Sequence, residues 1–105
     1  MTPLSAAAEQ ASELLKALSN PTRLKVLCSL VDSEKSVGQI ADALDVRENN
    51  VSQHLALLHK DRLVRTRREG QTIYYSIDDP AALQVIALLH ELFCGAEEIS
   101  VARRG

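Results

Sequence analysis

Aromatic side chains are scarce in this sequence. Although 46% of its 105 residues are hydrophobic, Tyr74, Tyr75 and Phe93 are the only aromatic ones. The core must therefore consist of aliphatic side chains, which favours packed helices. The length predicts one domain, residues 1–105. A domain of this size has a modest core, so oligomerisation would add useful burial.

Long apolar runs and leader-like segments are absent as well. No stretch of roughly eighteen apolar residues is available to span a membrane. The N-terminus does not pair a basic segment with an apolar one, as secretion signals do. We therefore expect a cytoplasmic chain without membrane contact. In that compartment the two cysteines, Cys28 and Cys94, are expected to stay reduced rather than form a structural disulfide.

Charge is unevenly distributed along the chain. The net charge is −2, yet residues 47–69 carry six basic side chains against three acidic ones. Residues 1–46 and 70–105 are net acidic. A basic segment between acidic flanks is typical of a surface that binds phosphates, although an ordinary surface of mixed charge would have the same composition.

The spacing of apolar residues predicts five helices. Helix starts are marked by Asn20 and Asp79, each followed by proline, and by Ser36. The expected helices cover about residues 4–18, 21–31, 37–44, 47–60 and 80–95. The short helices within about residues 36–60 predict a helix–turn–helix, although a generic helical hairpin would show the same spacing.

Beyond the fourth helix the apolar spacing changes to every second residue. Leu63–Arg68 and Thr72–Ile77 therefore read as the strands of a hairpin, within about residues 62–78, with Glu69–Gly70 at its tip. The alternation places Tyr75 in the core and Tyr74 outside it. The expected fold is mainly α-helical with a small β-hairpin, in the order four helices, two strands and a last helix.

The last helix is apolar on more than one face, and one protomer cannot cover all of it. Its apolar residues are Leu83, Val85, Ile86, Leu88, Leu89, Leu92 and Phe93. We expect helices 4–18 and 80–95 to form the interface of a homodimer.

The helix at about residues 47–60 has the composition of a helix that enters the major groove of DNA. With Val51, Leu55 and Leu58 turned inward, the opposite face carries short hydrogen-bonding side chains and a terminal cation: Asn49, Ser52, Gln53, Ala56 and Lys60. Amides and hydroxyls suit base edges, and positive charge suits phosphates. His54 lies at the edge of the inward stripe, where a phosphate contact and plain packing both remain open. The alternative to DNA binding is that these outward-facing residues simply form a polar face in contact with water.

Four segments carry a resemblance to a known family. Residues 18–27 (LSNPTRLKVL) resemble the second-helix signature of the arsenic-repressor (ArsR) family of winged helix–turn–helix regulators. Residues 51–55 (VSQHL), followed by 63–64 (LV) and 67–70 (RREG), resemble its recognition helix and wing. The match covers about residues 9–94.

The resemblance implies a transcriptional repressor that binds an inverted repeat in double-stranded DNA as a symmetric dimer. Ser52, Gln53 and Asn49 would read bases, and Arg67 and Arg68 would contact the backbone or the minor groove from the wing. One departure concerns Arg47, where members usually carry Ser or Thr. We therefore expect Asp45 to cap the recognition helix, with Glu48 completing a capping box, and the half-site preference stays open.

The metal sites of the family are not matched. No cysteine lies near residues 36–40, and of the four ligand positions associated with the last helix only Asp79 offers a ligand, because Ala81, Leu92 and Gly95 occupy the others. One ligand does not bind zinc tightly, so no metal or other cofactor is expected.

The surroundings and spacing of Cys28 and Cys94 are similar to those in the sulfide-responsive, persulfide-sensing branch of the family. The resemblance implies that reactive sulfur species join the two thiols through a di- or polysulfide bridge and release the DNA. Inserted sulfur atoms lengthen the reach of such a bridge beyond that of a disulfide. A peroxide-type disulfide switch and a regulator without cysteine sensing are the alternatives, and small buried thiols are common.

Two other functional classes remain to be weighed. An enzyme is not expected, because His54, His59 and His90 accompany no nucleophile motif, phosphate-binding loop or recognisable carboxylate pair. A winged helix used only for protein docking is the more serious alternative, since a fold does not determine a function.

Overall fold

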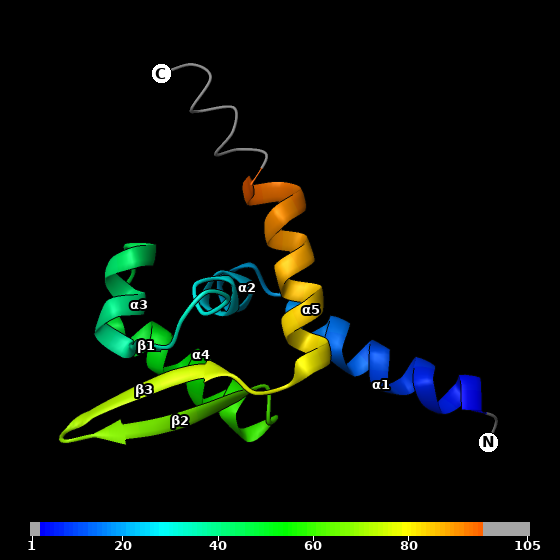
Figure 1. The fold of residues 1–105 in the computed structure, drawn as a ribbon, viewed down its shortest axis with the longest axis horizontal. Helices are drawn as coiled ribbons and strands as arrows, with labels where there is room; N and C mark the ends of the chain where they lie inside the picture. Colours follow the sequence, from blue (N-terminus) through cyan, green and yellow to red (C-terminus); the bar gives the residue numbers. More distant parts are fainter. Residues whose placement is uncertain (1–2, 96–105) are drawn as a thin grey trace, which may run out of the picture.

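The computed structural model describes residues 3–95, and their side chains as far as Phe93. Along this part of the chain five α-helices and three strands follow one another, and a π-helical turn, η1, comes last (Figure 1). In order they are α1 (Pro3–Leu18), α2 (Pro21–Cys28), β1 (Lys35–Ser36), α3 (Val37–Leu44), α4 (Glu48–Lys60), β2 (Val64–Glu69), β3 (Thr72–Ile77), α5 (Pro80–Leu89) and η1 (His90–Gly95).

An aliphatic core joins α2, α3, α4, α5 and the start of the hairpin, as the scarcity of aromatic residues predicts. All the buried residues among those described are apolar. The largest fully buried side chains are Leu27, Ile40, Leu55, Leu58, Ile86, Val26, Val51 and Val64. Since they come from each of these elements, the helix–turn–helix and the hairpin share one hydrophobic cluster.

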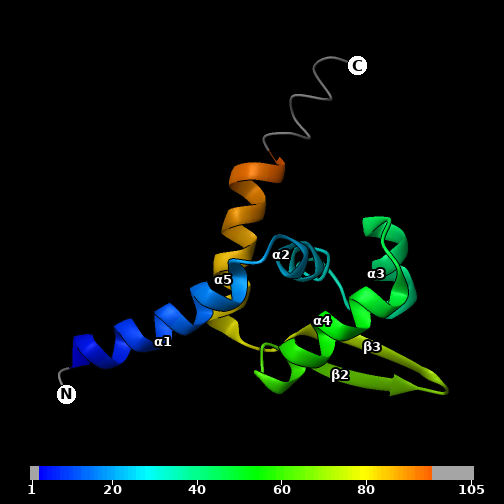
Figure 2. The ribbon, with the colours of Figure 1, turned by 180° about the vertical axis from the view of Figure 1, so that it is seen from behind.

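The α1 helix extends away from this core, and its first turns lie far from the other helices in both views (Figures 1 and 2). Only Ala17 and Leu18, at its C-terminal end, are buried. The helix predicted over residues 80–95 is also present, but at His90 its α-helical hydrogen bonding gives way to the π-helical turn η1.

Three of the predicted helix starts are confirmed. The Asn20 side chain accepts a hydrogen bond from the backbone N–H of Arg23 at 3.0 Å. Ser36 and Gln39 form a reciprocal capping box at the start of α3. Asp79 accepts hydrogen bonds from the backbone of Ala81 and Ala82, directly before α5.

The predicted cap of α4 is wrong. Asp45 adopts a left-handed conformation (φ 55°) and ends α3, while the backbone N–H of Val46 bonds to the Ala41 carbonyl at 3.1 Å. Because this turn uses Asp45, the N-cap of α4 is Arg47, whose side chain makes no capping hydrogen bond. Glu48 is therefore the first helical residue, where its negative charge interacts favourably with the positive end of the helix dipole.

Two further boundaries differ from the prediction. The α2 helix ends at Cys28 rather than near Val31, because beyond Ser29 the amides bond three residues back, Leu30 to Leu27 and Val31 to Cys28. The segment that follows connects the predicted helices 21–31 and 37–44, and the sequence predicts no strand there. It contains β1, which pairs with β3 at only two positions.

The sheet has the strand order β1–β3–β2, and both pairings are antiparallel. The β2–β3 hairpin is present as predicted, but its loop is Gly70–Gln71, one residue later than expected, because Glu69 still pairs with Thr72. Gly70 takes a positive φ of 63° there, which glycine adopts without strain. Tyr75 packs against the core as predicted, and Tyr74 does not belong to it.

Among the described helices, none combines the length and the apolar character needed to cross a membrane.

Candidate nucleic-acid interface

The α4 helix separates an apolar face from a polar one as the sequence predicts. Val51, Leu55 and Leu58 are buried, with exposed fractions of 1% or less. The predicted outward set is exposed throughout, and consists of Asn49, Ser52, Gln53, Ala56 and Lys60. The fold thus presents one continuous strip of amide, hydroxyl and ammonium groups along α4, with a small residue, Ala56, that permits close approach.

His54 lies between the two faces of α4. Its side chain is partly buried, and its Nδ1 atom is buried without a hydrogen-bond partner among the described residues. One edge of the ring is thereby packed inside the protein, so the structure brings His54 to the rim of the polar strip rather than into it.

The hairpin has two chemically different faces, because side chains alternate along a strand. Val64, Thr66 and Arg68 of β2 lie on the same face as Tyr75, which packs against the core. Arg65, Arg67 and Glu69 lie on the opposite face. Arg67 and Arg68, the two arginines predicted to contact DNA from the wing, therefore point to opposite sides of the sheet.

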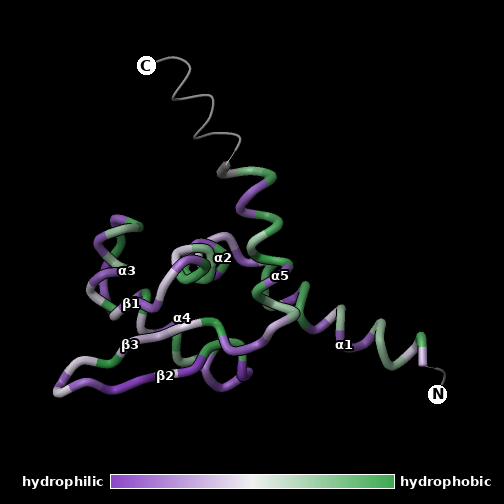
Figure 3. Tube along the Cα trace, in the orientation of Figure 1, coloured by the Kyte–Doolittle hydropathy of each residue, from purple (hydrophilic) through white to green (hydrophobic). Residues whose placement is uncertain are grey.

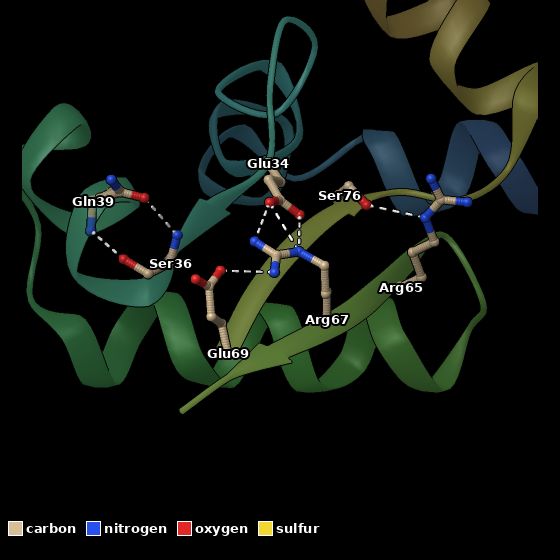
Figure 4. A network of polar contacts seen from close by, with 7 residues as sticks. All are labelled: Glu34, Ser36, Gln39, Arg65, Arg67, Glu69 and Ser76. Atoms are coloured by element: carbon tan, nitrogen blue, oxygen red, sulfur yellow. Dashed lines mark hydrogen bonds and ion pairs between the residues drawn. The ribbon is translucent and has the colours of Figure 1, made fainter. Parts of the chain in front are cut away.

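Arg67 is engaged by two carboxylates (Figure 4). Its Nε atom donates to both carboxylate oxygens of Glu34, at 3.0 and 3.1 Å, and its Nη1 atom donates to Glu69 at 2.9 Å. Its guanidinium carbon lies 4.8 Å from the centre of the Tyr74 ring. The hydrogen bonds that Arg67 donates to Glu34 and Glu69 raise the pKa of Arg67, and the bonds that Glu34 accepts from Arg67 lower the pKa of Glu34.

Arg68 has different surroundings. Its exposed side chain donates from Nε to the carbonyl of Gly70 at the hairpin tip, at 3.2 Å, and it forms no ion pair with another described residue. Arg65, by contrast, donates to Ser76 at 3.2 Å and lies 3.7 Å from an oxygen of Asp78. Of the three hairpin arginines, Arg68 is the one whose charge is not balanced by a neighbouring carboxylate.

Glu34 was not identified from the sequence. It precedes Arg67 by 33 residues, and no motif or periodic pattern includes it. Only the strand order, which places the start of β1 beside the hairpin, brings the two side chains together.

Comparison with known proteins identifies the family. Residues 20–66 match the family model described as bacterial regulatory protein, arsR family. The chain is 45% identical to the transcriptional activator HlyU of Vibrio cholerae, over 81% of this chain and 79% of the relative. It is 39% identical to the biofilm growth-associated repressor of Agrobacterium fabrum, over 91% and 85% of the two chains. The solved structure of reduced HlyU from Vibrio cholerae, at 40% identity, superposes with a TM-score of 0.83 over 90% of this chain and 99% of that one.

The chain belongs to the ArsR family.

Membership establishes a DNA-binding transcriptional regulator with a winged helix–turn–helix fold, and not an enzyme. Activators and repressors both occur among the relatives. In this ArsR-family chain the helix–turn–helix consists of α3 and α4, and the wing is the β2–β3 hairpin.

The two cysteines of this ArsR-family chain lie at the ends of helical elements. Cys28 is the last residue of α2, and its half-buried side chain packs against the core. Cys94 falls in η1, and its side chain lies outside the described part. Within the described residues, no three His, Cys, Asp or Glu side chains are grouped so that they could bind a metal ion.

Apolar side chains are exposed on α1, α5 and η1, and Figure 3 colours the hydrophobic residues along these elements green. The most exposed are Leu4, Leu15, Leu88, Leu92 and Phe93. A groove lined in part by Ala11, Leu14, Leu63 and Val85 runs between α1 and the start of α5. The two helices predicted to form the dimer interface, over residues 4–18 and 80–95, thus contain six of the eight exposed large hydrophobic residues in the described part of the chain.

Proposed function

We propose that this chain is a dimeric transcriptional repressor that binds an inverted-repeat operator and releases it when reactive sulfur species join Cys28 and Cys94. The observation that carries the DNA-binding part is the exposed polar strip of α4, held on a helix whose other face is fully buried.

In the proposed complex the polar strip lies in the major groove. Gln53 can present both a donor and an acceptor to one base, as amide side chains do with adenine. Asn49 and Ser52 flank it and read neighbouring positions, while Lys60 at the end of α4 neutralises a phosphate. His54, at the rim, contacts the backbone or supports packing. Arg68 provides the phosphate or minor-groove contact from the wing.

A comparison of two glutamine variants tests this arrangement. Gln53→Ala is expected to cost about 1–3 kcal/mol at one operator position and to relax the preference for the base there. Gln84→Ala, which removes an exposed glutamine on α5, is the matched control and is expected to leave the preference for the base unchanged, because α5 does not enter the groove in the proposed complex. Equal behaviour of the two variants in a binding assay over single-base operator mutants would refute the groove assignment.

Arg68→Gln is expected to act differently, because phosphate contacts carry no sequence information. It should weaken binding to all sequences alike and reduce the slope of log K against log[salt] by about 0.9 per protomer, or about 1.8 for the dimer. An unchanged slope would remove Arg68 from the interface.

The repressor assignment is supported by relatives named as biofilm growth-associated repressors, although HlyU is named as an activator. Whether the protein represses or activates transcription is tested in vitro with a promoter that contains the operator. Transcription is expected to fall when the protein is added. A rise would make this chain an activator.

The sensing proposal is supported by the positions of the cysteines and by the packing of α2 against α5, next to η1. In the proposed reaction a thiolate takes the outer sulfur of an organic persulfide and releases the thiol. The thiolate of the second cysteine then attacks the penultimate sulfur and releases hydrosulfide, which leaves a disulfide, or a trisulfide when a second persulfide has first added another sulfur. This bridge would tie α2 to η1 and change the separation of the two recognition helices in the dimer.

Mass spectrometry after exposure to an organic persulfide is expected to show the bridge, and DNA binding is expected to weaken by about 1–3 kcal/mol. Cys28→Ser and Cys94→Ser should each bind DNA like the parent protein and ignore the persulfide. A full response in either variant would refute the two-cysteine mechanism and leave DNA binding intact. A peroxide-type switch would instead respond to hydrogen peroxide with a plain disulfide.

A further inference from the structure

We propose that Glu34 is a positioning residue for DNA binding: with Arg67 and Tyr74 it forms a clamp that ties the wing to the helix–turn–helix, and Arg67 serves this clamp rather than a phosphate. This inference rests on the DNA interface proposed above.

The clamp spans all three strands of the sheet. Glu34 directly precedes β1, Tyr74 belongs to the central strand β3, and Arg67 belongs to β2 on the other side. In the register of the sheet Ser36 faces Tyr74, and Tyr74 faces Arg67. The arginine therefore reaches from one outer strand to the start of the other, and its guanidinium stacks on the ring of the strand between them.

The contact between Glu34 and Arg67 has the geometry of a strong pair. The carboxylate is met by both Nε and Nη2 of the guanidinium, and the remaining terminal nitrogen donates to Glu69. Bidentate pairing of this kind specifies direction as well as distance. Figure 4 shows the three charged side chains converging above one face of the sheet.

The clamp reinforces a minimal connection. β1 contributes only two residues to the sheet, Lys35 and Ser36. Ser36 is also the N-cap of α3, and α3 packs on α4. A contact between the hairpin and the residue before β1, such as that of Arg67 with Glu34, therefore fixes the position of the hairpin relative to α3 and α4. Since wing and recognition helix must contact the same duplex, their relative position affects affinity.

The charge of the cluster argues against a phosphate contact through Arg67. One guanidinium is balanced by two carboxylates, Glu34 and Glu69. Neighbouring Arg65 lies close to a further carboxylate, that of Asp78. If Arg67 turned towards DNA, it would leave two uncompensated negative charges near the phosphates, whereas Arg68 on the opposite face carries no such penalty.

The decisive measurement is DNA affinity as a function of salt for Glu34→Gln, Arg67→Gln and the parent protein, well below the temperature of unfolding. Both variants are expected to bind about two- to five-fold more weakly, the size set by a half-exposed ion pair, with the parent's salt slope. Glu9→Gln, at an exposed glutamate on α1, controls for the change in net charge. Its dimerisation is compared with that of the parent by sedimentation, because α1 belongs to the expected dimer interface. The exchanged pair Glu34→Arg with Arg67→Glu is expected to restore most of the affinity.

The opposite hypothesis makes opposite predictions. If Glu34 merely competes with DNA for Arg67, Glu34→Gln will bind more tightly, and Arg67→Gln will reduce the salt slope by about 0.9 per protomer, or about 1.8 for the dimer. Either result, or an affinity of Glu34→Gln equal to that of the parent, would overturn the clamp. Failure of the parent protein itself to bind operator DNA would instead refute the proposed interface.

Discussion

Leu88 provides a direct test of the dimer interface. It is 53% exposed although it belongs to α5, whose neighbouring residues Ile86 and Ala82 are completely buried. We expect a second protomer to cover it. Leu88→Ser removes the apolar side chain without adding a charge, so its effect reports lost burial rather than electrostatic repulsion.

The size of the effect follows from the exposed fraction. Complete burial of a leucine side chain is worth about 1.5–3 kcal/mol. About half of Leu88 remains to be covered in the protomer, which corresponds to about 1 kcal/mol. A symmetric interface contains the residue twice, so the dimer loses about 2 kcal/mol. Since 1.4 kcal/mol is a factor of ten, its dissociation constant is expected to rise about 30-fold.

The chain offers a matched control. Leu57 is 50% exposed, but it lies on α4, away from the predicted interface. Sedimentation equilibrium of Leu88→Ser, Leu57→Ser and the parent protein separates the two effects, because only Leu88→Ser is expected to shift the monomer–dimer equilibrium. Equal dissociation constants for all three proteins, or a monomeric parent at micromolar concentration, would refute an interface built from α5.

Three further predictions concern stability, each measured by urea unfolding. Asn20→Ala removes the side-chain cap of α2 and is expected to lower the free energy of unfolding by about 1 kcal/mol; no change would mean that the cap contributes nothing. Leu55→Ala empties a completely buried site and is expected to cost about 2–5 kcal/mol, whereas a loss below 1 kcal/mol would indicate that the core collapses around it. The hydrogen bond from Arg67 lowers the pKa of Glu34, and the one from Lys35 lowers the pKa of Asp32. The two carboxylates therefore stabilise the fold at pH values above their ordinary pKa values, 4.5 for Glu34 and 3.8 for Asp32. This stabilisation is lost as the pH falls through their lowered pKa values. Glu34→Gln is expected to flatten that acid limb, and an unchanged limb would contradict the pairing.

Regular elements were predictable where the signal is local. The inward stripe of α4 repeats at helical spacing, so Val51, Leu55 and Leu58 mark its buried face without knowledge of the fold. The caps Asn20 and Asp79 act within one turn of their own helices, and each satisfies backbone amides that would otherwise lack partners.

Elements that depend on a distant partner were not predictable in the same way. β1 is too short to show a period of two, and it exists because Tyr74 and Tyr75 supply its backbone hydrogen-bond partners. The start of α4 was misplaced because Asp45 is acceptable both as an N-cap and as a left-handed residue, and only the end of α3 decides between the two. The contact of Glu34 with Arg67 has no sequence signature, because strand order alone creates it.

The distribution of charge illustrates how the fold changes the meaning of a local count. The segment 47–69 is basic along the sequence, but the sheet brings in Glu34 from the N-terminal side and Asp78 from the C-terminal side, next to Arg67 and Arg65. One face of the wing is thereby neutralised by acidic residues that the count assigns to the flanks. The basic side chains of the segment that form no ion pair with a described residue are Arg47, Lys60, Arg62 and Arg68. They lie at the two ends of α4 and on the opposite face of the hairpin. The unpaired positive charge therefore lies at the two ends of α4 and on one face of the hairpin, where the phosphates that flank the proposed groove contacts are expected to lie.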